Sequence, residues 1–151
     1  MDLMYTDSQT GGKIYQCGYR EIPWNLHTNN PKIDLVIFAA AECPPLNHFT
    51  GARLEYHPNR DLLYQKGTTQ YDELLRNALS AVPSVVDAIK KGETVLSTCA
   101  AGMNRSGIIT ALSIKRLNPS LNPKDIISAI QKKRTCGALT NPAFNLMIEE
   151  N

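Results

Sequence analysis

The sequence predicts an α/β fold with a mostly parallel central sheet, and two observations support this prediction. First, Leu35–Ala39 is a continuous apolar run of strand length, which is typical of a strand buried on both faces. Second, short strand-like segments alternate with longer segments whose apolar residues recur at helical spacing. Such alternation places helices against a mostly parallel sheet.

Four segments have the composition or alternation of strands: Lys13–Tyr19, Leu35–Ala39, Arg53–Tyr56 and Glu93–Thr98. The third segment is expected to end at His57-Pro58, because proline cannot donate a hydrogen bond within a sheet. Residues 1–12 form a polar start, which we expect to be loose.

Helical spacing of apolar residues extends over residues 69–91. Pro83 falls inside this pattern and predicts a kink or two shorter helices, and Gly92 ends it. Three further helices are predicted: one over Ile108–Leu117, one from Asn122-Pro123 to about Arg134, and one that begins at Asn141-Pro142. In the last two, a capping asparagine precedes a proline that the first helical turn tolerates.

The bulk properties describe an ordinary globular chain. Its 151 residues suffice for a single domain, residues 1–151, with one core. The net charge of +2 is too small to indicate binding to nucleic acid or to a membrane. The four cysteines lack the spacing of a zinc site or of a disulfide framework and indicate reduced thiols. No signal-like start or membrane-length apolar run is present, so we expect a soluble, cytoplasmic protein.

The segment from Val95 to Gly107 predicts a phosphate site with a sulfur nucleophile at its base. Five residues separate Cys99 from Arg105, in a tight loop between a strand-like and a helical segment. The backbone N–H groups of such a loop and the positive end of the helix dipole converge on one spot that can hold an oxyanion. The same field favours a thiolate at Cys99. Arg105 adds a fork of donors that matches two phosphate oxygens, and Gly102 permits the turn.

The pattern Cys-x-x-Gly-x-x-Arg-Ser, from Cys99 to Ser106, resembles the active-site motif of the cysteine-dependent protein tyrosine phosphatases, in particular their dual-specificity branch. The resemblance implies a small twisted sheet flanked by helices, with the loop between a central strand and its helix. It implies hydrolysis through a phosphocysteine at Cys99, without metal or cofactor. The family usually has His before the cysteine, where this chain has Thr98.

The reaction divides its roles among a few residues. Arg105 would stabilise the phosphate oxygens together with backbone N–H groups of the loop, and Ser106 could hydrogen-bond the sulfur and ease its departure. The loop residues expected to bind phosphate are Ala100, Ala101, Gly102, Met103, Asn104 and Arg105.

A general acid is also needed, and two carboxylates are candidates. Asp61 lies on the loop after the Arg53–Tyr56 strand, where the family carries its acid, although its spacing from Cys99 is somewhat longer than the family's. Asp72 has the better spacing but lies in the first turns of a helix, where an acidic residue is usually a partner of the dipole. We predict Asp61.

Two other features have an ordinary interpretation that we prefer. Asn141 could brace the active loop, but we expect a helix N-cap before Pro142. The basic run Lys132-Lys133-Arg134 could attract an acidic substrate, but we expect a solvated helix end.

The leading hypothesis is a phosphatase for phosphotyrosine proteins, with phosphoserine and phosphothreonine as further substrates, acting as a monomer and away from membranes. Three alternatives stay open. The loop also resembles that of relatives that remove phosphate from RNA 5′ ends, a likeness carried by Asn104. A rhodanese-type sulfurtransferase would likewise use a loop cysteine, without an acid, and a phosphate-binding adaptor would use the fold without turnover.

Overall fold

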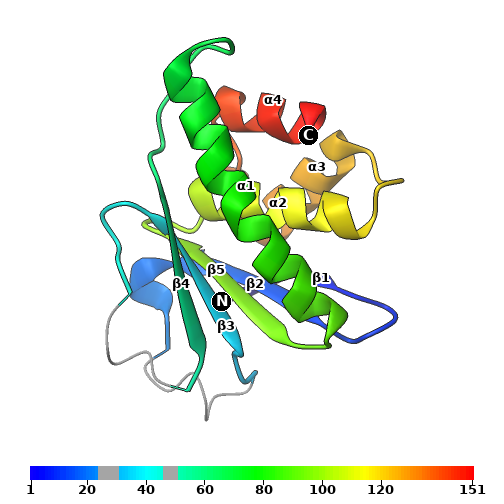
Figure 1. Ribbon diagram of the computed structural model, residues 1–151. Coiled ribbons are helices and arrows are strands. Elements are labelled where there is room, and N and C mark those ends of the chain that lie inside the picture. Colours follow the sequence, from blue (N-terminus) through cyan, green and yellow to red (C-terminus); the bar gives the residue numbers. More distant parts are fainter. Residues whose placement is uncertain (24–30, 46–50) are drawn as a thin grey trace.

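The structure is a computed structural model that describes residues 1–23, 31–45 and 51–151 (Figure 1). Its centre is a five-stranded sheet in the order β1-β2-β5-β3-β4. The strands are β1 (Asp2–Thr6), β2 (Lys13–Gly18), β3 (Leu35–Ala40), β4 (Arg53–Asn59) and β5 (Thr94–Cys99). β2, β5, β3 and β4 run parallel, and β1 pairs antiparallel with β2. The predicted α/β fold with a mostly parallel sheet is therefore confirmed.

Among the described residues, four α-helices pack against one face of the sheet, and the short 3-10 helix η1 follows β2. They are α1 (Thr69–Lys90), α2 (Arg105–Leu117), α3 (Pro123–Lys133) and α4 (Pro142–Glu150), and η1 is Tyr19–Glu21. In Figure 1, α1 crosses in front of the sheet, and α2, α3 and α4 lie next to α1. Within the described part of the chain, no helix has the length and apolar character needed to cross a membrane.

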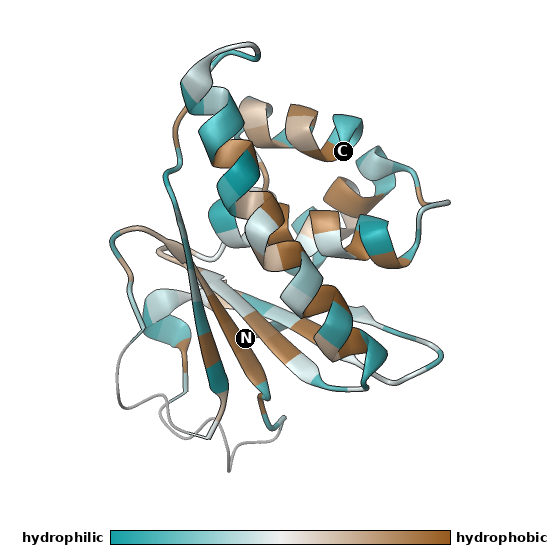
Figure 2. Ribbon diagram, in the orientation of Figure 1, coloured by the Kyte–Doolittle hydropathy of each residue, from teal (hydrophilic) through white to brown (hydrophobic). Residues whose placement is uncertain are grey.

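The apolar run of β3 is explained by burial on both faces, because all six of its residues are buried. Leu35, Ile37 and Ala39 belong to the large core shared with the helices. Val36 and Phe38 belong to a smaller core on the opposite face. Figure 2 shows this hydrophobic character along the central strands. Two cores that meet in one strand leave no face for polar residues, which is why the run does not alternate.

The structure corrects the expected start of the chain. Residues 1–12 were expected to be loose, but Asp2–Thr6 form strand β1. The strand pairs with β2 across a bulge between Leu3 and Tyr5, and Met4 is only 2% exposed. The bulge interrupts the alternation by which a strand is recognised in sequence.

Proline is tolerated at two positions where we predicted a break. β4 continues through Pro58 to Asn59, because β4 is an edge strand and an edge needs no donor on its outer side. α1 is a single helix that contains Pro83, so the alternative of two shorter helices is wrong. Pro83 is exposed, and water can satisfy a carbonyl that its ring leaves free.

The predicted helix ends are confirmed by their capping bonds. The Asn122 side chain accepts a hydrogen bond from the Lys124 N–H, and the Asn141 side chain accepts one from the Ala143 N–H. Gly92, with φ of 77°, follows the end of α1. The chain next forms β5, the central strand, whose carboxyl end at Cys99 leads through residues 100–104 into α2.

Candidate active site

Cys99 lies at the carboxyl end of β5 and points into the start of α2. It is 2% exposed, and its Sγ atom is 3.3 Å from the Oγ atom of Ser106. Ser97 Oγ donates to the Ser106 carbonyl at 3.1 Å, which ties the strand to the first turn of the helix. The sulfur therefore sits at the N-terminus of α2 with a hydroxyl beside it.

The loop turns at Gly102, where only glycine fits. Gly102 has φ of 68°, and a Cβ atom there would lie 2.2 Å from the Cys17 carbonyl carbon and 2.4 Å from the Gly18 nitrogen. Gln16 Nε2 donates to the Gly102 carbonyl at 2.9 Å. The loop is thus pressed against the end of β2, where a side chain would push it away.

Arg105 is the buried cation of the site. Its side chain is 10% exposed, and its Nη1 and Nη2 atoms each donate to an oxygen of Glu42 at 2.6 Å. Burial opposes the charge, but the bonds to Glu42 and the nearness of Cys99 outweigh it, so the pKa of Arg105 is raised. The same bonds lower the pKa of Glu42. Nη1 also donates to the Asn59 carbonyl at 3.3 Å, so bonds among the described residues use three of the five N–H groups of Arg105. The buried Nε, which has no partner among these residues, and the second N–H of Nη2 thus remain for an anion.

Sequence reasoning did not identify Glu42. It follows β3, whose carboxyl end lies beside that of β5 in the parallel sheet. A carboxylate directly after a strand that neighbours the loop is the signal that could have identified it, because parallel strands bring their carboxyl ends to one edge.

Asp61 is brought to the loop by two side-chain amides. Asn104 Nδ2 donates to its Oδ2 atom at 2.9 Å, and Asn141 Nδ2 donates to its Oδ1 atom at 2.8 Å. Asn104 Oδ1 in turn accepts from the Thr140 N–H at 2.9 Å. Asp72, the other candidate acid, lies in the first turn of α1, as expected of a dipole partner. Of the two carboxylates, Asp61 is the one held against the loop.

Asn141 combines the two roles that we treated as alternatives. Its Oδ1 caps α4 by accepting from the Ala143 N–H at 3.0 Å. Its Nδ2 donates to Asp61 and, at 3.1 Å, to the Leu62 carbonyl. The preferred interpretation as an N-cap is correct but incomplete.

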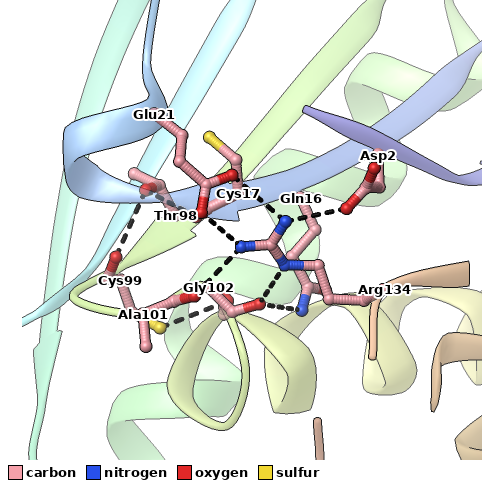
Figure 3. Close-up of polar contacts among 10 residues, drawn as sticks. Asp2, Gln16, Cys17, Glu21, Thr98, Cys99, Ala101, Gly102 and Arg134 are labelled. Carbon is pink, nitrogen blue, oxygen red and sulfur yellow. Dashed lines mark hydrogen bonds and ion pairs between the residues drawn. The ribbon is translucent and has the colours of Figure 1, made fainter. Parts of the chain in front are cut away.

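Arg134 is not the solvated helix end that we expected. Its side chain is 12% exposed and donates to the carbonyls of Ala101 at 3.1 Å and Gly102 at 3.0 Å (Figure 3). It also forms ion pairs with Asp2 and Glu21. A basic residue at a helix end has no local feature that predicts such contacts, because its partners come from distant parts of the chain.

Thr98 stands where the resembled family usually has His. Its Oγ1 atom is buried and donates to the Cys17 carbonyl at 2.9 Å. Thr98 and Cys17 lie opposite each other in the pairing of β5 with β2. Thr98 thus links the strand that carries the nucleophile to its neighbour.

Comparisons with known proteins agree with this geometry at the level of fold. No protein-family model and no curated protein sequence matches the chain. Among solved structures, a variant of human DUSP28 is 15% identical with a TM-score of 0.75, over 99% of this chain and 93% of that one. Tk-PTP in its active form is 15% identical with a TM-score of 0.70, over 99% and 95%. A mouse dual specificity phosphatase complexed with zinc tungstate is 15% identical with a TM-score of 0.71, over 92% and 80%. This chain therefore has the fold of the cysteine-dependent dual-specificity phosphatases.

Proposed function

We propose that this protein is a cysteine-dependent phosphomonoester hydrolase of the dual-specificity type. The observation that carries the proposal is the convergence of three groups at one loop. They are the Cys99 sulfur, the Nε of Arg105, which has no partner in the described part of the chain, and the carboxylate of Asp61, held at the loop by Asn104 and Asn141. A nucleophile, a cation and a proton donor are the three requirements for cleaving a phosphate ester.

The first step forms a phosphocysteine. The Cys99 thiolate attacks phosphorus, and the bond from phosphorus to the leaving oxygen breaks as the new S–P bond forms. Asp61 gives its proton to the leaving oxygen, while Arg105 and the N–H groups of residues 100–105 stabilise the remaining phosphate oxygens.

In the second step water attacks phosphorus, the S–P bond breaks, and Asp61 takes back a proton from the water. The Ser106 hydroxyl, 3.3 Å from the sulfur, stabilises the departing thiolate. Inorganic phosphate is then released, and the Cys99 thiolate and the protonated Asp61 are restored. The cycle consumes only the phosphate ester and water.

We propose a phosphorylated protein as substrate, with phosphotyrosine first and phosphoserine and phosphothreonine as further substrates. A cleft of about 650 Å³ lies beside the loop. Arg20 and Glu42 line it, and side chains of both charges suit an extended polar chain.

We also propose a cytoplasmic location, which the four free cysteines suit.

Two of the alternatives lose support. Asn104, which carried the likeness to RNA phosphatases, has its amide engaged by Asp61 and by the Thr140 N–H. A sulfurtransferase needs no acid, whereas Asp61 is held by donors to both of its carboxylate oxygens. The first observation weakens the argument for an RNA substrate, and the second gives Asp61 a place at the loop that a sulfurtransferase would not need.

The test is hydrolysis of an aryl phosphate by the full chain in the presence of a chelator. We expect turnover that the chelator does not reduce and that iodoacetate abolishes, with added inorganic phosphate slowing the alkylation. A folded protein that transfers sulfur from thiosulfate to cyanide and releases no phosphate would instead establish the sulfurtransferase.

Asp61→Ala tests the general acid. We expect it to lower kcat by about 10²- to 10³-fold for an alkyl or phenyl phosphate, because a poor leaving group needs a proton as its bond breaks. For a strongly acidic nitrophenol as leaving group, the loss should be much smaller. The measurement is kcat across a series of leaving groups, and Asp72→Ala, which removes the other candidate, should match the parent throughout. Equal losses across the series would exclude Asp61 as the acid.

A further inference from the structure

Arg134 uses every N–H group of its guanidinium inside the protein. Nε donates to the Gly102 carbonyl, and Nη2 donates to the Ala101 carbonyl and to Glu21 Oε1 at 2.6 Å. Nη1 donates to Asp2 Oδ2 at 2.7 Å and to Glu21 Oε2 at 3.1 Å. An arginine has five N–H donors, so none is left for a ligand. Figure 3 shows the side chain between the loop and the two carboxylates.

The two carbonyls that Arg134 holds determine where two N–H groups point. In a planar trans peptide, the carbonyl of one residue and the N–H of the next point in opposite directions. The hydrogen bond to the Ala101 carbonyl therefore directs the Gly102 N–H away from Arg134. The hydrogen bond to the Gly102 carbonyl likewise directs the Met103 N–H away from Arg134. Both N–H groups belong to the loop between Cys99 and Arg105.

The surroundings of Arg134 fix the guanidinium before a ligand arrives. The bond to Glu21 is the main reason that the pKa of Arg134 is raised, and the same bond lowers the pKa of Glu21. Asp2 and Glu21 come from β1 and η1, so two further elements orient the side chain. Gln16 adds a second donor to the Gly102 carbonyl.

We propose that Arg134 is a positioning residue that holds the Gly102 and Met103 N–H groups toward the phosphate site. This proposal rests on the proposed function, in which those N–H groups bind phosphate. Arg134 itself does not touch the phosphate. It acts on the far side of the peptide planes, where a charged donor also polarises each peptide and strengthens the opposite N–H.

Arg134→Lys tests the proposal, because lysine keeps the charge but lacks the planar fork that reaches two carbonyls and two carboxylates together. Arg53→Lys is the matched control. Arg53 is an exposed arginine of the edge strand β4, and it also forms an ion pair, with Glu93. Each substitution is made in the parent and in a Cys99→Ser background. The readouts are kcat and KM with an aryl phosphate, and calorimetric binding of inorganic phosphate to the Cys99→Ser protein.

We expect Arg134→Lys to weaken phosphate binding and to lower kcat/KM by at least about 10-fold, since loss of one such donor in an oxyanion site costs about 10²-fold or more. In ¹⁵N-labelled protein, the amide signals of Gly102 and Met103 should shift with phosphate in the Cys99→Ser protein and respond much less with Arg134→Lys added. A purely structural role would lower the melting temperature without selecting these two amides. Arg53→Lys should leave every readout unchanged.

If Arg134→Lys does not fold, Glu21→Gln provides the same test, because it removes the charge that orients the guanidinium. A folded Arg134→Lys protein with unchanged phosphate binding, amide response and kcat/KM would overturn the proposal and leave the phosphatase function standing. Weakened phosphate binding in a protein whose parent hydrolyses no phosphoester would support the positioning role and reject the phosphatase. A Cys99→Ser protein that binds no phosphate would overturn both.

Discussion

Cys99→Ser is expected to lower kcat on an aryl phosphate by on the order of 10⁴-fold or more, because a serine hydroxyl in this loop is not ionised and is a poor nucleophile. The substitution exchanges one small side chain for another at a position that is 2% exposed, so the loop and Arg105 should stay in place. The variant should therefore still bind inorganic phosphate. Turnover and calorimetric binding together separate loss of the nucleophile from loss of the site.

The control for this change is Cys136→Ser, the same substitution at the exposed cysteine. It should keep the parent's kcat and KM. A Cys99→Ser protein that retains more than about one-hundredth of the parent's kcat would contradict the phosphocysteine route, since removal of an essential nucleophile costs far more than this. Activity lost in both variants would indicate a general effect of thiol removal instead.

The parts of the fold that sequence predicted well are those whose residues carry their own signal. Leu35–Ala40 is apolar throughout because both of its faces are buried. Asn122 and Asn141 each cap a helix by accepting a hydrogen bond from the N–H two residues further along the chain. Strand β1 carries no such signal. It depends on pairing with β2, and Lys133 Nζ holds its Met4 carbonyl at 2.8 Å across the molecule.

The candidate site divides in the same way. Cys99, Gly102, Arg105 and Ser106 lie in one short run, and local spacing was enough to predict their arrangement. Glu42 lies 63 residues from Arg105 in sequence and reaches it only because β3 neighbours β5. The contacts that Arg134 makes with the loop likewise join separate elements. Such pairs follow from topology, which a single sequence does not specify residue by residue.

Local interpretation was incomplete where one side chain serves two purposes. Asn104 was expected to bind phosphate as part of the loop and to carry a likeness to RNA phosphatases, but its side-chain amide joins the loop to Asp61 and to Thr140. An amide has a donor and an acceptor end, and for Asn104 the partners of both ends lie far away in sequence. The place of Asp61 beside the loop could therefore be predicted from its position along the chain, but not the side chains that hold it there.

Arg105→Lys is expected to lower kcat/KM by about 10²- to 10³-fold, because it removes a donor that the transition state needs and the fork that carries it. In the parent, Nη1 and Nη2 are bound to Glu42 while Nε is free of partners among the described residues. One ammonium cannot pair with Glu42 and bind phosphate oxygens in the same geometry. The measurement is kcat/KM with an aryl phosphate, alongside the melting temperature. Arg116→Lys, at an exposed position in the last turn of the same helix, should match the parent.

Glu42→Gln separates the position of this guanidinium from its charge. The cation is kept, but the paired carboxylate that fixes the plane of its fork is lost. The kcat/KM of Glu42→Gln should therefore lie between that of the parent and that of Arg105→Lys.

The pH dependence of the stability of Glu42→Gln gives a second readout. Because Arg105 lowers the pKa of Glu42, this carboxylate stabilises the fold above its unfolded pKa and ceases to do so as pH falls through its folded pKa. The melting temperature of Glu42→Gln should therefore fall less than the parent's on acidification through that range. If Glu42→Gln matched the parent in kcat/KM, the loop alone would be sufficient to orient Arg105, and the ion pair would serve only stability.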